Sequence, residues 1–167
     1  YRQIVLTGGP GAGKTAVLEL ARKAFCRHVL VAPEAASIVF GGGFPRDHDI
    51  PARKASQHAI YSVQVQLENY ARTRNEVRVV LCDRGTVDGL AYWPGSASDY
   101  WTELGTNLVL ELERYAAVIH LHPPLAAHGY DLSNHVRIET AEEAAIIDAR
   151  ITEAWRDHPH RFDVPAT

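Results

Sequence analysis

The chain has 167 residues, a formal net charge of −3, 46% hydrophobic residues and 22% charged residues. This composition excludes a disordered chain, a coiled coil and a collagen-like repeat, and no apolar run is long enough for a transmembrane helix. The charge balance offers no basic face of the kind that binds nucleic acid. The two cysteines, Cys26 and Cys82, stand in no metal or redox spacing, which favours a reducing, cytoplasmic compartment.

Five short apolar runs alternate with helical patterns along the chain. The strands are predicted over residues 3–7, 28–32, 76–82, 116–121 and 161–164. The helices are predicted over residues 14–27, the first part of 36–51, 53–74, 99–115 and 140–158, the last of which opens with a capping box. This alternation predicts a parallel α/β sheet with helices on both faces. No repeat or linker interrupts the pattern, so we expect one domain over residues 1–167.

The loop after the first strand carries the strongest motif. The run Gly-Gly-Pro-Gly-Ala-Gly-Lys-Thr fits G-x-x-x-x-G-K-[ST], follows a strand and opens a helix. Its glycines let successive backbone N–H groups face an anion, and the helix adds the positive end of its dipole. Lys14 would contact the β- and γ-phosphates, and the Thr15 hydroxyl would contact Mg²⁺. We expect the nucleotide phosphates to be held by Gly8, Gly9, Pro10, Gly11, Ala12, Gly13, Lys14, Thr15 and Ala16.

The third predicted strand ends in an aspartate and an arginine, at the sheet edge where ligands bind in open parallel sheets. Asp83 is the expected carboxylate for Mg²⁺, held through a water; the alternative is a turn or helix-cap role. Motor-type ATPases place a glutamate directly after this aspartate, but here the residue is Arg84. Its forked guanidinium is suited to bridging phosphates, and a surface ion pair is the alternative.

A second carboxylate follows the second predicted strand. Glu34 lies at the same sheet edge as the phosphate loop. It is placed either to accept a proton from an acceptor hydroxyl or to cap the following helix, where negative charge is favoured. The residues alone leave these two roles open.

Several of these motifs together resemble a known family. They are the loop at 8–15, Pro-Glu-Ala-Ala at 33–36, Asp-Arg-Gly at 83–85, the run 88–92, and Asn-x-x-Arg-x-Glu at 134–139 with the following Glu-Glu-Ala. The combination resembles the AAA-domain P-loop proteins related to the ribosylnicotinamide kinase domain, and more distantly thymidylate and deoxynucleoside kinases. The resemblance implies a three-layer P-loop NTPase sandwich with sheet order 2-3-1-4-5, binding of ATP or GTP, and Mg²⁺. It does not imply one acceptor.

In small kinases of this kind, a lid closes over the donor phosphates and supplies arginines. The polar segment at about 123–139 occupies that position, and lid closure favours transfer over hydrolysis by excluding water. Arg137 is the candidate for stabilising charge on the transferring phosphoryl group. A salt bridge to Glu139 or Glu142 is the alternative.

Weaker signals concern histidines and aromatic residues. His120 and His122 alternate on a predicted strand, and together with His128 and His135 they raise the idea of a zinc site. No Cys or carboxylate completes a recognisable spacing, so a role without metal is favoured. Tyr92 and Trp93 are expected to wall an acceptor pocket, Trp101 is expected to pack, and the loop 41–51 is either a substrate flap or a connection.

The resulting hypothesis is a Mg²⁺-dependent phosphotransferase. It would move the γ-phosphoryl group of ATP or GTP to a small nucleoside-like or other small-molecule acceptor. Asp83 with Glu34 would position or deprotonate the acceptor, and Arg84 and Arg137 would stabilise charge. The expected partners are a nucleoside triphosphate and a small acceptor, with no nucleic acid and no membrane. The alternatives are a nucleotide-dependent NTPase or switch that acts on a partner, and a degenerate nucleotide-binding module without turnover.

Overall fold

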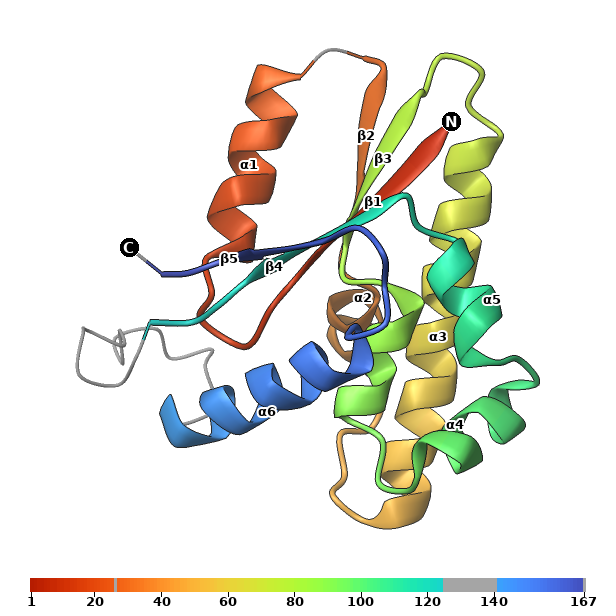
Figure 1. Cartoon of the computed structure of the whole chain (residues 1–167). Helices are drawn as coiled ribbons and strands as arrows, with labels where there is room; N and C mark the ends of the chain where they lie inside the picture. The colour runs from red at the N-terminus through yellow and green to blue at the C-terminus, as the bar shows by residue number, and fades with distance from the viewer. Residues whose placement is uncertain (26, 125–140, 167) are drawn as a thin grey trace.

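Five parallel strands form one sheet in the order β2-β3-β1-β4-β5 (Figure 1). The structure is a computed structural model that describes residues 1–25, 27–124 and 141–166. Its strands are β1 (Arg2–Thr7), β2 (Val29–Ala32), β3 (Val79–Asp83), β4 (Ala117–Leu121) and β5 (Arg161–Val164). The predicted parallel sheet and its order are confirmed. β3 begins three residues later than predicted because the chain still turns at Val77, whose N–H donates to the Arg74 carbonyl.

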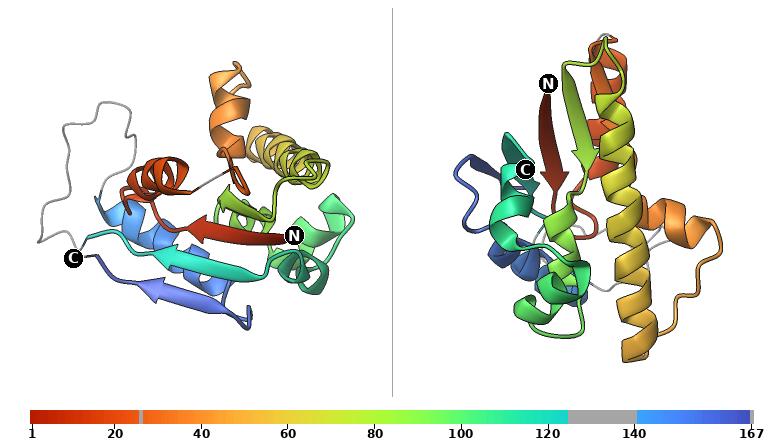
Figure 2. Two further views of the ribbon diagram at one scale, coloured as in Figure 1. Left: turned by 90° about the horizontal axis from the view of Figure 1, so that it is seen from above. Right: turned by 90° about the vertical axis from the view of Figure 1, so that its right-hand side faces the viewer.

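Helices cover the sheet on both sides. They are α1 (Lys14–Ala24), α2 (Ala35–Gly41), α3 (Ile50–Arg72), the 3₁₀ helix η1 (Thr86–Ala91), α4 (Ala97–Leu104), α5 (Leu108–Glu113) and α6 (Ala141–Ala154). Figures 1 and 2 show α1 on one side of the sheet and α3, α4 and α5 on the other, while α6 runs past the end where the chain leaves β1. Within the described ranges, no helix is both long enough and apolar enough to cross a membrane.

The single helix predicted over 99–115 is wrong, because the chain breaks it into α4 and α5. Gly105 ends α4 in the left-handed conformation with φ 68°. Asn107 then starts α5, and its side chain accepts a hydrogen bond from the Leu110 N–H. The regular spacing of Leu104, Leu108 and Leu112 survives the break, since all three pack against the same core cluster. That regularity made the two helices look like one.

The larger hydrophobic cluster packs the central strands against side chains of α3 and α6. Val5, Val80, Cys82 and Val118 come from the three central strands and are fully buried. They pack in one cluster with Trp155, which follows α6 and is also fully buried. These strands read as nearly continuous apolar runs because both of their faces are covered.

The buried side of α3 is polar, which the sequence pattern did not predict. The apolar side chains at helical spacing along this helix are Ile60, Val63, Leu67, Tyr70 and Ala71, a stripe that is expected to be the buried side. Only Ala71 is buried, and Tyr70 is 53% exposed. The buried side instead carries Ser56, Gln57, Gln64 and Glu68. A polar buried face requires hydrogen-bond partners, and Glu68 has several.

The Glu68 carboxylate is fully buried and joins three segments. It accepts hydrogen bonds from the Gln3 amide at 2.8 Å, the Gln64 amide at 2.8 Å and the Tyr115 hydroxyl at 2.7 Å. Its ionic partner is Arg114, with Nη2 at 2.6 Å. This network anchors α3 to β1 and to the chain before β4, on the side of the sheet that carries the site described below.

We expect Glu68→Ala to lower the free energy of unfolding by about 3–5 kcal/mol, because it leaves the Arg114 guanidinium half-buried without its carboxylate. Urea denaturation followed by circular dichroism measures the loss. Glu113→Ala, at an exposed position on α5, is the control and should stay within about 0.5 kcal/mol of wild type. A loss below about 1 kcal/mol for Glu68→Ala would show that the network is not structural.

Candidate active site

The loop between β1 and α1 has the conformation that the motif predicts. Gly8, Gly11 and Gly13 all have positive φ, at 141°, 81° and 84°. A Cβ on Gly8 would lie 2.0 Å from the Leu121 carbonyl oxygen, so the loop passes β4 too closely for any side chain. The loop delivers Lys14 to the first position of α1, where the helix N-terminus favours an anion.

The Lys14 ammonium is held inside this loop. It donates to the Gly8 carbonyl at 2.9 Å and to the Gly9 carbonyl at 3.1 Å. Burial, assisted by the nearby Arg84 guanidinium, lowers the pKa of Lys14 to about 8, against the opposing pull of the Asp83 carboxylate. A phosphate at this loop would bring a counter-charge to the buried Lys14 ammonium.

The end of β3 makes a strained turn that aims an arginine at the loop. Arg84 has φ 69°, a left-handed conformation that is uncommon for a residue with a side chain. Two bonds hold the turn: the Arg84 N–H donates to the Leu6 carbonyl, and the Gly85 N–H donates to the Asp88 carboxylate at 2.8 Å. A Cβ on Gly85 would lie 2.8 Å from a Val5 methyl, so the following residue has to be glycine. The turn is thus fixed from both sides.

The Arg84 side chain reaches the carboxylate that follows β2. Its Nε donates to Glu34 at 2.9 Å, and its guanidinium lies 5.6 Å from the centre of the Tyr92 ring. Burial opposes the charge on Glu34, but Arg84 and the Ser37 hydroxyl outweigh it and keep the pKa of Glu34 below its ordinary value. Glu34 precedes α2, yet its side chain makes no capping hydrogen bond. The Glu34 side chain is thus held by Arg84 and Ser37 at the cavity and does not cap α2.

Asp83 lies between these groups as the last residue of β3. Burial and the neighbouring Glu34 raise the pKa of Asp83 to about 6, against the pull of Lys14. Its Oδ1 atom is buried and has no hydrogen-bond partner among the described residues. A hard divalent cation matches such an oxygen, and Thr15 lines the same cavity. Asp83 and Thr15 thus fit Mg²⁺.

These groups line one cavity of about 950 Å³. Its walls come from the loop before α1, the exits of β2 and β3, the loop after α2, one face of α3, η1 and the start of α6. The predicted site residues that it brings together are Pro10, Gly11, Lys14, Thr15, Glu34, Asp83 and Arg84. The other predicted loop residues, Gly8, Gly9, Ala12, Gly13 and Ala16, shape the loop without lining the cavity.

Several cavity residues were missed at the level of sequence. Gln57 is 8% exposed, and its amide makes no side-chain hydrogen bond within the described chain. It shares one face of α3 with Ile60, Tyr61 and Gln64, at the spacing of consecutive helical turns. That spacing was the available signal, but no site role was predicted for this face of α3. Arg150 on α6 also lines the cavity and adds a cation that no motif marked.

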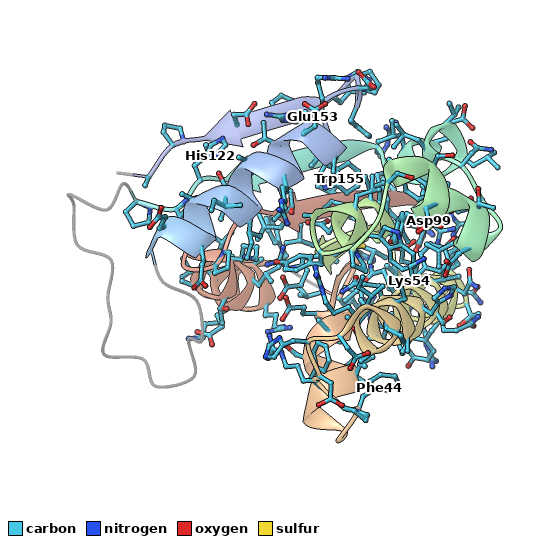
Figure 3. All side chains as sticks on the ribbon, turned by 90° about the horizontal axis from the view of Figure 1, so that it is seen from below. Phe44, Lys54, Asp99, His122, Glu153 and Trp155 are labelled. Atoms are coloured by element: carbon cyan, nitrogen blue, oxygen red, sulfur yellow. The ribbon has the colours of Figure 1, made fainter. Side chains whose placement is uncertain are left out.

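Of the three aromatic residues singled out in the sequence, two lie where they were expected and one does not. Tyr92 lines the cavity, as predicted, and Trp101 is buried in the core, as predicted. Trp93 does not line the cavity: its Nε1 donates to Asp99 at 3.0 Å, and the Lys54 ammonium lies 4.9 Å from its ring centre. Figure 3 shows Lys54 and Asp99 near each other at the edge of α3 and α4. Trp93 packs instead of binding.

Other predicted residues fall outside the cavity or outside the described chain. Arg137 and the lid from residue 125 onward lie outside the described residues, as do His128 and His135. His120 and His122 stack with ring centres 4.3 Å apart, and the carboxylates of Asp148 and Asp163 lie beside them. The loop after α2 does reach the cavity, through Arg46, Asp47 and His48.

Comparison with solved structures identifies the fold. A deoxyadenosine kinase from M. mycoides with bound dATP matches with TM-score 0.63 and 16% identity, over 98% of this chain and 90% of that chain. A thymidylate kinase from Candida albicans matches with TM-score 0.55 and 10% identity, over 98% and 83%. A shikimate kinase from Acinetobacter baumannii in complex with shikimate matches with TM-score 0.50 and 18% identity, over 99% and 84%. The fold is shared with these P-loop kinases.

A comparison with curated protein sequences found no match. The family model described as "AAA domain" matches residues 3–165, almost the whole chain. Together with the phosphate loop and the sheet order 2-3-1-4-5, this match shows that the chain belongs to the AAA domain family of P-loop proteins.

Proposed function

We propose that the protein is a Mg²⁺-dependent phosphotransferase that moves the γ-phosphoryl group of ATP or GTP to a hydroxyl of a small, nucleoside-like acceptor. The observation that carries this proposal is the single cavity that runs from Lys14 past the Glu34–Arg84 pair to the buried face of α3. A hydrolase needs room only for the donor and a water. This cavity extends well beyond the phosphate loop, and its volume of about 950 Å³ is at the upper end for small-molecule sites.

The donor binds at the loop end. The loop's N–H groups and the start of α1 face the phosphates, and the Lys14 ammonium contacts the β- and γ-phosphate oxygens. Thr15 and Asp83 would hold Mg²⁺, which neutralises charge on the phosphate oxygens when it is bound. The chain contributes preorganisation here, since the glycines and the Lys14–Gly8 hydrogen bond fix the shape of the loop.

The acceptor binds beyond Arg84. Its hydroxyl oxygen forms the new bond to the γ-phosphorus as the bond from that phosphorus to the bridging oxygen breaks. The hydroxyl proton passes to the Glu34 carboxylate, which is ionised in the resting site. Arg84 lies between the two substrates and stabilises charge on the transferring group, and Arg150 and Arg137 are proposed to assist. Gln57 and Tyr61 offer polar groups to the body of the acceptor.

The bound ligands of the structural neighbours support this division. One of those kinases holds a deoxynucleoside triphosphate and another holds a hydroxylated acid. We propose that residues 1–167 act as one nucleotide-binding domain in which residues 123–139 form a lid. We place the acceptor-recognising surface on α3.

The first test of the function is an acceptor panel. Purified protein with MgATP or MgGTP is offered nucleosides, nucleotides and small hydroxylated acids, and phosphorylated product is measured by mass spectrometry. At least one nucleoside-like acceptor should raise triphosphate consumption by orders of magnitude, because the site aligns a hydroxyl better than it aligns water. If no acceptor is phosphorylated while a protein partner stimulates hydrolysis, the NTPase or switch function replaces this one.

Glu34→Gln tests the proposed base. The amide keeps the shape and an oxygen for Arg84 but cannot take the acceptor's proton, so kcat should fall by about 100–10,000-fold. Affinity for MgATP, measured by calorimetry, should be unchanged because Glu34 lies on the acceptor side. The matched control is Glu19→Gln, at an exposed position on α1. Wild-type transfer in Glu34→Gln would remove Glu34 from the mechanism.

The lowered pKa of Lys14 predicts a pH dependence of binding. Above this pKa of about 8, the Lys14 ammonium loses the proton whose charge attracts phosphate. MgATP affinity should therefore fall by up to about tenfold for each further pH unit. Calorimetry in buffers of different ionisation enthalpy should show proton uptake on binding in that range. Lys14→Arg, whose guanidinium stays charged, should bind more weakly but with no alkaline decline. A wild-type affinity that is flat up to pH 10 would contradict this assignment.

A further inference from the structure

We propose that Asp148 of α6 is a positioning residue of the nucleotide site, which orients the Gly8–Gly9 peptide of the phosphate loop and through it Lys14. The inference rests on the proposed binding of a triphosphate by this loop. Asp148 lies outside every motif of the sequence, and it does not line the cavity. It acts from behind the loop, together with two histidines of β4 and its exit.

The contact with the loop is direct. The Gly9 N–H donates to Asp148 Oδ1 at 2.8 Å in a buried position. A Cβ on Gly9 would lie 2.9 Å from the Asp148 Cβ, so the carboxylate reaches the loop only because residue 9 is glycine. The backbone therefore approaches α6 at the point where the loop begins to curve.

The same peptide group also faces Lys14. The Gly9 N–H and the Gly8 carbonyl belong to one trans peptide, so they point in opposite directions. Asp148 holds the N–H, and the opposed carbonyl oxygen accepts from the Lys14 ammonium at 2.9 Å. Rotation of this peptide would break both bonds at once. Asp148 thus sets the direction of the carbonyl on which the Lys14 ammonium rests.

Two imidazoles hold the Asp148 carboxylate in place. His120 Nε2 lies 2.8 Å from Oδ1 and His122 Nδ1 lies 2.7 Å from Oδ2. Burial opposes ionisation of Asp148, but these two bonds and the Gly9 amide outweigh it and lower the pKa of Asp148 to about 2. All of its contacts come from donors, so Asp148 is a fixed anion with a single orientation.

His122 extends the chain of contacts to β5. Its second ring nitrogen, Nε2, lies 2.9 Å from Asp163 Oδ1, and that oxygen also accepts from Arg161 at 2.7 Å. Figure 3 shows His122 in the space between α6 and β5. With a carboxylate at each ring nitrogen, His122 donates both of its N–H protons as an imidazolium. Burial opposes this charge, but the Asp148 and Asp163 carboxylates outweigh burial and raise the pKa of His122. The guanidinium of Arg161 on the same oxygen disfavours a metal ion there.

The protonation of His122 distinguishes two variants of Asp148. Asp148→Ala removes the acceptor for Gly9 outright. In Asp148→Asn, the amide oxygen still accepts from Gly9 and His120, but the amide NH₂ then faces His122 Nδ1. That contact is a hydrogen bond only when Nδ1 carries no proton. The groups that face His122 are Asp148, Asp163, His120 across the stacked rings, and Arg161 through Asp163.

The experiment measures the MgATP affinity of each variant by calorimetry at about pH 5.5 and at about pH 7.5. Each affinity is expressed as a ratio to that of wild type at the same pH. Asp148→Ala should bind at least about tenfold more weakly at both, the scale of one lost charge-assisted hydrogen bond. Asp148→Asn should bind about tenfold more weakly at pH 5.5 and closer to wild type at pH 7.5, because losing one of the two carboxylates that hold the His122 proton makes that proton easier to release as the pH rises. Glu153→Ala on the exposed side of α6 is the control and should bind like wild type at both.

A purely structural role for Asp148 would give the same ratio for Asp148→Asn at both pH values, and that result would overturn the inference even if Asp148→Ala failed to fold. Wild-type affinity in a folded Asp148→Ala, confirmed by circular dichroism, would also overturn it. Failure of the wild-type protein to bind MgATP is distinguishable from both results, because it would overturn the proposed function and this inference with it.

Discussion

The buried carboxylate of Asp88 ties together the segments that build the site. It accepts hydrogen bonds from the Thr7 hydroxyl at the end of β1, from the Gly85 N–H after β3, and from the Trp155 indole beyond α6 at 3.2 Å. Its remaining contact is with the Arg84 guanidinium at 3.5 Å. A buried anion with this many donors is costly to move, so it fixes the left-handed turn at Arg84 relative to the phosphate loop.

The parallel sheet supplies the rest of the geometry. Because β1, β2 and β3 run in the same direction and in register, their carboxyl ends meet at one edge. The chain leaving those three ends provides the phosphate loop, Glu34 and Asp83. Two carboxylates, one ammonium and one guanidinium are thereby brought together in partly or fully buried positions, and their pKa values shift in both directions. Such mutual perturbation is characteristic of reactive sites.

The acceptor end of the cavity is formed by a different element, the helix α3. The buried face of α3 carries polar side chains in place of an apolar stripe, and part of that face is anchored through Glu68 while part remains open to the cavity through Gln57 and Tyr61. One helix therefore serves both stability and recognition. Because α3 both anchors the fold and lines the cavity, its residue pattern indicated neither a buried helix side nor a binding surface.

Residues in local motifs were predictable, and residues that act across the fold were not. Lys14 and Thr15 follow from a fixed spacing, and Glu34 and Asp83 follow from the rule that parallel strands share a carboxyl edge. Gln57 takes its role from the cavity that distant segments form around it, and Asp148 takes its role from Gly9, 139 residues away; no local pattern encodes either.

The helix break at Gly105 was missed because the leucine spacing continued across it. The polar face of α3 was misassigned because helical periodicity identifies a buried side only when that side is apolar.

The central claim is that a donor and a separate small acceptor occupy one cavity at the same time. A crystal structure of the protein with a non-hydrolysable ATP analogue, Mg²⁺ and a pool of nucleosides tests it most directly. We predict the triphosphate on the phosphate loop with Mg²⁺ near Asp83 and Thr15, and a nucleoside whose hydroxyl lies between Glu34 and Arg84. A triphosphate bound with only ordered water between Glu34 and Arg84, across the whole pool, would contradict the account and favour hydrolysis.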